Sequence, residues 1–228
     1  EPRVGSGAVG RSGGGGVLES CLAAVKALDA RALEGALDRA AVDLGGLALL
    51  QRVVVPLAQE IGRLWREGVI TAAHEHFATA VLRTVLGHAA KPFPGSDSAP
   101  VLVVATPSGQ MHELGALVVG ASAAHLGWRV TYLGASLPAA EIAGAARQNQ
   151  ATAVALSLVY PEDDPRVEGE LYRLRSLLAP EVLLMAGGRA ASAYGGTLRE
   201  IGALEIKDLP HLWSTLEELR KPGRRGRR

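Results

Sequence analysis

From Val101 to Ile206, short apolar runs alternate with longer segments of helical periodicity, and this alternation constrains the fold more than any other feature. Continuous apolar strands joined by helical crossovers are typical of a parallel sheet covered on both faces. The pattern therefore predicts an α/β domain over residues 101–220, with a Rossmann-like (flavodoxin-like) doubly wound parallel sheet. The predicted strands are 101–105, 129–133, 152–157, 182–186 and a short one at 204–206, and the predicted helices are 113–126, 139–149, 166–178, 189–201 and 208–219.

The first third of the chain has a different rhythm, with apolar residues at helical spacing. Pro56 predicts a kink in the third helix, and Thr71 is the expected N-cap of the fourth. Four helices with short connections predict an N-terminal four-helix bundle over residues 17–90. The four segments are 17–30, 31–45, 47–68 and 71–90, with glycines at 45, 46 and 68 where helices end.

Three segments are predicted to lie outside the folded parts. Residues 1–16 are rich in glycine and predict a disordered leader, 91–100 predict a linker, and 221–228 predict a basic disordered tail. The net charge of +1 argues against a general nucleic-acid-binding surface. The single cysteine, Cys21, excludes an internal disulfide framework and favours a reducing cytoplasm. No apolar run has the roughly 20 residues that a membrane span requires, so no membrane partner is expected.

Polar residues and glycines follow the predicted strands. His112 comes after the first strand, Ser157 ends the third, and the Gly187-Gly188 pair follows the fourth. Because ligands of doubly wound sheets bind at the carboxyl ends of the strands, these residues are candidates for one site. A neutral imidazole is a suitable donor for a transition metal. The serine and the glycines, taken alone, are equally consistent with tight turns.

The spacing of His112 and Gly115, the segment YLGASLP, the Ser157-Leu158 pair and the Gly187-Gly188 pair resemble the cobalamin-binding fold. The motif of that family is Asp-x-His-x-x-Gly. The resemblance implies that His112 displaces the benzimidazole of the cofactor and becomes the lower axial ligand of cobalt. It also implies a groove for the displaced nucleotide tail. The implied cofactor-binding residues of this domain are Gln110, Met111, Glu113, Leu114, Gly115, Leu133, Gly134, Ser157, Leu158, Val159, Gly187 and Gly188.

Gln110 stands where the family usually has aspartate. A carboxylate at this position would accept the imidazole N–H and increase electron donation to the metal. A glutamine carbonyl can accept the same hydrogen bond without the charge. We therefore expect ligation by His112 to persist with weaker electron donation.

The helical half narrows the resemblance, because Trp65 is followed ten and eleven residues later by Glu75 and His76. This arrangement is similar to that of CarH-type cobalamin photoreceptors, and the resemblance covers about residues 17–220. It implies that Trp65, Glu75 and His76 line a cap over the upper face of adenosylcobalamin, with Trp65 against the adenosyl group. It also implies a light sensor rather than an enzyme. Light would break the Co–C bond and change bundle packing, homo-oligomer state (dimer or tetramer) and signalling output such as transcription regulation.

Two differences from CarH-type proteins leave alternatives open. Arg66 stands where those proteins have a histidine that binds cobalt after photolysis, so His74, His76 or water would take the upper position. Those proteins also begin with a helix-turn-helix domain, which this sequence lacks, so DNA contact would require a further domain or a partner.

Three other interpretations remain at this point. A bilin such as biliverdin could be a second chromophore attached at Cys21, although a lone cysteine in a helix is more often a buried small side chain. A corrinoid methyl-carrier protein serving methyltransferases shares the predicted architecture, but Gln110 and the bulky Trp65 weigh against it. In a non-corrinoid binding module, His112 would be incidental.

Overall fold

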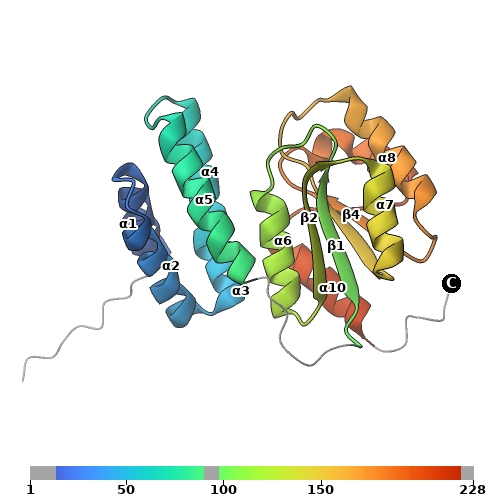
Figure 1. The fold of residues 1–228 in the computed structure, drawn as a ribbon, viewed down its shortest axis with the longest axis horizontal. Helices are drawn as coiled ribbons and strands as arrows, with labels where there is room; N and C mark the ends of the chain where they lie inside the picture. The colour runs from blue at the N-terminus through green and yellow to red at the C-terminus, as the bar shows by residue number, and fades with distance from the viewer. Residues whose placement is uncertain (1–13, 90–97, 222–228) are drawn as a thin grey trace, which may run out of the picture. The chain divides into compact units, whose positions relative to one another are not determined.

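The computed structural model describes residues 14–89 and 98–221 (Figure 1). The chain divides into two compact units, Glu1–Val81 and Leu82–Arg228. Most of the predicted leader, most of the predicted linker and the tail beyond Lys221 lie outside the described residues, and the predicted domain boundaries stay predictions. Within the described part of the chain, no helix is long and apolar enough to cross a membrane.

The N-terminal unit is helical, as predicted. Asp29 precedes the second helix and caps it, with its carboxylate accepting a hydrogen bond from the Ala32 N–H at 2.9 Å. Gly45 ends the same helix at φ +78°, a conformation that favours glycine. The elements are α1 (Gly14–Lys26), α2 (Ala30–Leu44), α3 (Gly46–Leu49), the π-helical turn η1 (Leu50–Val54), α4 (Val55–Arg66) and α5 (Ala72–Ala89).

Three details of the helical unit differ from expectation. Helix α1 begins at Gly14, so the last glycines of the expected leader are helical, and the Ser20 hydroxyl donates to the Gly16 carbonyl at 2.9 Å. The third helix contains η1 just before Pro56. Proline has no N–H to donate to the preceding turn, and the π-helical turn accommodates this loss. The Thr71 hydroxyl lies 2.8 Å from the His74 ring nitrogen Nδ1, and this contact occupies the side chain expected to cap α5.

The core of the helical unit follows the predicted apolar faces. Helix α1 packs against α2 and α4. Cys21 is fully buried among the core residues, and its pKa is raised by burial, an effect that Arg39 partly offsets. The side chains that fill this core include Leu33, Leu37, Leu50, Val53, Leu57 and Ile61.

The second unit is built on a five-stranded parallel sheet of order β2-β1-β3-β4-β5, which confirms the predicted fold class. The interior strand β1, which lies between β2 and β3, is buried along its whole length, as expected for a strand covered on both faces. Leu102 pairs with Val130 on one side and with Ala153 on the other. The strands are β1 (Val101–Pro107), β2 (Arg129–Leu137), β3 (Ala153–Ser157), β4 (Leu183–Gly187) and β5 (Leu204–Ile206).

Helices cover both faces of this sheet (Figure 1). Helices α6 and α10 pack against each other on one face, and α7 and α8 pack against each other on the opposite face. The α7–α8 face encloses a core that includes Val103, Val154 and Leu184. The bounds are α6 (Leu114–His125), α7 (Ala139–Gln148), α8 (Pro165–Leu177), the 3₁₀ turn η2 (Ala191–Tyr194), α9 (Gly195–Glu200) and α10 (Leu209–Arg220).

Two elements of the sheet domain differ from the predicted ranges. Strand β2 continues to Leu137, because register shifts against β1 and the positive φ of Gly134 and Ser136 let pairing resume beyond Tyr132. Leu133 and Gly134 therefore lie inside the strand. The helix predicted at 189–201 is split into η2 and the short α9, which begins with a pair of glycines of low helix propensity.

Candidate cofactor site at the carboxyl edge of the sheet

The segment between β1 and α6 is fixed before it reaches His112. Gly109 has φ +86°, and its N–H donates to the Ser136 hydroxyl at 3.0 Å. The Thr106 hydroxyl donates to the Gln110 carbonyl, and it accepts the Ser136 N–H at 2.8 Å. These contacts tie the segment to the end of β2. His112 follows as an exposed residue two positions before α6 begins.

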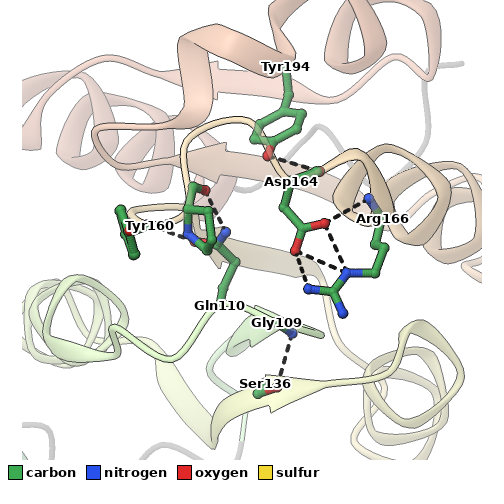
Figure 2. A network of polar contacts seen from close by, with 8 residues as sticks. Gly109, Gln110, Ser136, Tyr160, Asp164, Arg166 and Tyr194 are labelled. Atoms are coloured by element: carbon green, nitrogen blue, oxygen red, sulfur yellow. Dashed lines mark hydrogen bonds and ion pairs between the residues drawn. The ribbon is translucent and has the colours of Figure 1, made fainter.

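Gln110 differs from the expectation set by the family motif. Its side chain is fully buried, and its Oε1 accepts the N–H groups of Val159 at 2.8 Å and Tyr160 at 3.0 Å. Its Nε2 donates to the Pro161 carbonyl at 2.9 Å (Figure 2). Both lone pairs of Oε1 are therefore used by the segment after β3. A hydrogen bond from the His112 N–H to this oxygen, which the sequence permits, is not formed in the structure, because the glutamine side chain reaches backbone groups instead.

The His112 imidazole contacts the Tyr160 ring. The ring centroids are 5.7 Å apart and the planes meet at 78°, which is an edge-to-face pair. Tyr160 is 56% exposed. Within residues 14–89 and 98–221, the structure gives the His112 ring this aromatic contact and no hydrogen-bond partner. One face of the site is thus aromatic where the family motif would supply a carboxylate.

The residues beside His112 have different environments. Met111 is 67% exposed, which is unusual for an apolar side chain of this size. The Glu113 carboxylate accepts a hydrogen bond from the Tyr132 hydroxyl of β2. Burial raises the pKa of Tyr132, and the bond to Glu113 raises it further. Leu114 is the first residue of α6.

Ser157 and Gly115 meet at the end of β3. A Cβ atom at Gly115 would lie 2.5 Å from the Ser157 Oγ, so the glycine makes room for the hydroxyl. The Ser157 Oγ is buried, and among the described residues it has no hydrogen-bond partner. An unpaired buried hydroxyl is costly, so this oxygen is a candidate contact for a ligand.

The pair Gly187 and Gly188 at the end of β4 permits close backbone packing against the segment after β3. The Leu158 N–H donates to the Gly187 carbonyl at 2.8 Å, and the Leu158 carbonyl accepts the Ala190 N–H at 3.0 Å. Gly188 has φ +104°, and a Cβ atom there would overlap the Leu158 carbonyl. Only glycine fits this crossing, which brings the ends of β3 and β4 together.

The predicted residues of the helical unit lie on helix surfaces. Trp65, near the end of α4, is 49% exposed. In α5 the Glu75 carboxylate lies 2.8 Å from the His76 ring nitrogen Nδ1, and it accepts the Thr79 hydroxyl at 2.9 Å. The His76 side chain is 81% exposed. These side chains are available to a ligand without rearrangement of the core.

Two family models, both described as a B12 binding domain, match residues 17–89 and 100–206 of this chain. The chain belongs to the B12-binding family. The first match covers the helical unit up to the end of α5, and the second covers the sheet through β5. B12 is cobalamin, so the predicted cofactor class is confirmed.

Curated relatives of this B12-binding chain are transcriptional repressors of Myxococcus xanthus. It is 31% identical to the HTH-type transcriptional repressor CarH over 176 residues, which are 77% of this chain and 58% of CarH. It is 36% identical to the HTH-type repressor CarA over 135 residues, 59% of this chain and 45% of CarA. The chain spans about half the length of these relatives. The resemblance to CarH-type proteins is confirmed.

A solved structure shares the fold of the B12-binding chain. The monomethylamine corrinoid protein of Methanosarcina barkeri matches with a TM-score of 0.68 at 14% identity, over 90% of this chain and 99% of that protein. At this identity the match confirms the architecture and carries no functional assignment.

The residues present fit a cobalamin. His112 offers one exposed imidazole at the carboxyl edge of the sheet. A single protein ligand suits a metal that a macrocycle already coordinates. The unpaired Ser157 hydroxyl and the backbone crossing at Gly188 offer polar and close-packed walls to a nucleotide tail.

Sequence reasoning missed several residues that build this site. Tyr160 precedes a proline, and its apolar ring gave no sign that it contacts His112. Ser136 was noted only as part of a strand-end segment. Asp164 caps α8, its carboxylate pairs with Arg166 at 2.7 Å, and its carbonyl accepts the Tyr194 hydroxyl at 3.2 Å (Figure 2).

Cys21 is not accessible to a second chromophore. Its side chain is 0% exposed in the helical core, so its thiol is not accessible for addition to a bilin. The prediction that this cysteine is a buried small side chain is confirmed.

Proposed function

We propose that this chain is a cobalamin-binding light sensor that uses adenosylcobalamin and acts through a change in oligomeric state. The observation that carries the proposal is the combination of the exposed His112 after β1 with Trp65, Glu75 and His76 in a chain similar to the repressor CarH. Bound adenosylcobalamin would supply a Co–C bond that visible light breaks. The chain would act as a regulator rather than an enzyme.

Each group of residues has its own role in this proposal. His112 would donate its imidazole nitrogen to the lower face of cobalt. Ser157 would donate its hydroxyl to the nucleotide tail, which would satisfy the buried oxygen. The remaining predicted residues of the sheet domain would line the same edge without donating to the metal. We assign Trp65, Glu75 and His76 to the adenosyl side of the cofactor, as the resemblance to CarH-type proteins implies.

Arg66 makes the lit state of this chain distinctive. The family resemblance assigns the position after the tryptophan to a histidine, and an arginine cannot replace it because the guanidinium stays protonated and has no lone pair to donate. We propose that His74, His76 or water occupies the upper position after illumination. Of the two histidines, His76 is the more exposed. Its side chain is 81% exposed on α5, whereas His74 is partly buried.

The decisive experiment is an absorption spectrum of adenosylcobalamin-loaded protein before and after green light, with size-exclusion chromatography of both samples. We expect an irreversible spectral change and a change in elution volume. His112→Ala should abolish or alter the lit spectrum. An unchanged spectrum after illumination would reject light sensing and leave cobalamin binding intact.

The second candidate function is a corrinoid methyl carrier that serves methyltransferases. The shared fold with a corrinoid protein keeps it as an outcome of the experiment. Stable methylation of the bound cobalamin by a partner methyltransferase, without a response of oligomeric state to light, would favour it.

A further inference from the structure

This chain has Gln110 at the position of the family motif's aspartate, and the Gln110 side chain binds backbone groups. The Gln110 amide is oriented without ambiguity, because its oxygen faces two N–H donors and its nitrogen faces a carbonyl. Its three partners are consecutive residues, 159–161. Gln110 therefore joins the segment before α6 to the segment after β3 through a buried side chain.

The link has a direct consequence for Tyr160. Its backbone N–H is one of the donors to the Gln110 Oε1, so the position of its Cα is set by the amide. Its ring then lies edge-to-face with His112, two residues after Gln110 in the chain. Gln110 thus does not contact the imidazole itself. It binds the backbone of Tyr160, and the Tyr160 ring contacts the imidazole.

We propose that Tyr160, held in place by Gln110, is the positioning residue that orients the His112 imidazole for cobalt. The proposal rests on the proposed role of His112 as the lower ligand. In this arrangement the imidazole is restrained by an aromatic ring, and among the described residues no charged acceptor binds its N–H. Tyr160 and Gln110 touch neither the metal nor the reacting bond, and both act through His112.

The chemistry of the side chains explains why aspartate would not do the same. An aspartate is shorter by one methylene, and it has no N–H to donate to the Pro161 carbonyl. Placed in this fully buried position, a carboxylate would face that carbonyl oxygen and be destabilised. In the proposed arrangement, Gln110 and Tyr160 therefore act together: the amide holds the backbone of Tyr160, and the ring holds His112.

The test uses three variants with matched chemistry. Tyr160→Leu removes the aromatic ring from an exposed position, so the fold should stay intact. Tyr160→Phe keeps the ring and is the control, because the described hydrogen bonds give the Tyr160 hydroxyl no partner. Gln110→Glu keeps the length and the acceptor oxygen but loses the donor to the Pro161 carbonyl.

The first measurement is electron paramagnetic resonance of protein loaded with cob(II)alamin and labelled with ¹⁵N-histidine. A histidine ligand splits the signal into doublets, whereas the unlabelled benzimidazole gives triplets. We expect doublets in the native protein and in Tyr160→Phe. In Tyr160→Leu the ratio of histidine-bound to histidine-free cobalt should fall about two- to tenfold, the range expected for one aromatic pair. In Gln110→Glu the same ratio should also fall, by a smaller factor.

The second measurement needs no cofactor. The ring protons of His112 in the unloaded protein should carry a shift from the Tyr160 ring current in the nuclear magnetic resonance spectrum. Tyr160→Phe should keep this shift and Tyr160→Leu should abolish it.

The outcomes separate this inference from the proposed function. Absence of histidine doublets in the native protein would reject His112 as the lower ligand. Doublets in the native protein with an unchanged ratio in Tyr160→Leu would reject the positioning role of Tyr160 and leave the ligand assignment standing. If Gln110→Glu does not fold, the comparison of Tyr160→Leu with Tyr160→Phe decides whether Tyr160 positions His112.

Discussion

The candidate residues of the two units are held in place by contacts of different range. In the sheet domain, Gln110 binds backbone groups 49 to 51 residues away. In the helical unit, Glu75 binds His76 and Thr79, which are its neighbours on one helix. The first kind of contact exists only when the sheet is complete, and the second exists whenever the helix does. Substitutions in the sheet domain should therefore change stability, whereas those on the helix surfaces should change the response of the cofactor.

The largest effect is expected at Gly188. Gly188→Ala would place a methyl group against the Leu158 carbonyl and would also hold alanine at φ +104°. Backbone overlap cannot be relieved by a rotamer change, so we expect a loss of about 3–5 kcal/mol in the free energy of unfolding. Urea denaturation of the cofactor-free protein measures it.

The matched control for Gly188 is Gly134. It has φ +93°, but a Cβ atom there would meet no heavy atom within 4 Å. Gly134→Ala should therefore cost only the conformational strain, about 1–2 kcal/mol. Equal losses at the two positions would show that conformation, and not the close crossing of β3 and β4, determines stability at this edge.

A smaller effect is expected at the contact between α6 and β3. Gly115→Ala would bring a methyl group to 2.5 Å from the Ser157 Oγ, and we expect a loss of about 1–3 kcal/mol. In a Ser157→Ala background the nearest remaining atom is the Ser157 Cβ, which the substitution keeps, and its distance of 3.6 Å is an ordinary contact. The cost of the methyl group should then largely disappear.

A double-mutant cycle by urea denaturation measures this coupling. Additive effects of Gly115→Ala and Ser157→Ala would contradict the view that the glycine is required by the serine hydroxyl. The same four proteins report whether Ser157 contributes to cobalamin affinity independently of packing.

Features that depend on local pattern could be predicted from the sequence. Strand and helix periodicity predicted the five strands, the two-part architecture and the position of His112 at the carboxyl edge, because these depend on local pattern and on general rules of parallel sheets. Trp65 and His76 are exposed on their helices, and the cap that Trp65, Glu75 and His76 are expected to form stays a prediction. The family resemblance added the identity of the cofactor.

The contacts of Gln110 and Tyr160 could not be predicted in the same way. They join segments that are some fifty residues apart, and their partners are backbone groups that any residue carries. The extension of β2 past Tyr132 depends on a register shift against β1, which no pattern within the strand specifies. Sequence patterns therefore predicted that His112 follows the first strand, but not the backbone contacts that the Gln110 side chain makes.

The pH dependence of stability tests a third contact of the sheet domain. The bond from the Arg166 side chain, aided by its backbone N–H, lowers the pKa of Asp164. A carboxyl with a lowered folded-state pKa stabilises the protein above its unfolded-state pKa of about 4, and this contribution is lost as pH falls through the folded-state value. Asp164→Asn should thus be less stable than the native protein at pH about 7, and the difference should shrink below pH about 4. A urea midpoint difference that stays constant with pH would contradict the ion pair's role.

The smallest effect on stability is expected on α5, and it tests the other half of the comparison. His76→Ala removes a side chain that is 81% exposed and whose ring contacts Glu75 next to it in the chain. Exposed pairs contribute little, so the free energy of unfolding should change by less than about 0.5 kcal/mol. The lit spectrum of the adenosylcobalamin-loaded variant should nevertheless differ from that of the native protein if His76 takes the upper position that Arg66 cannot. A large loss of stability would show that α5 depends on this surface pair for its structure. An unchanged lit spectrum would exclude His76 and leave His74 or water in the upper position.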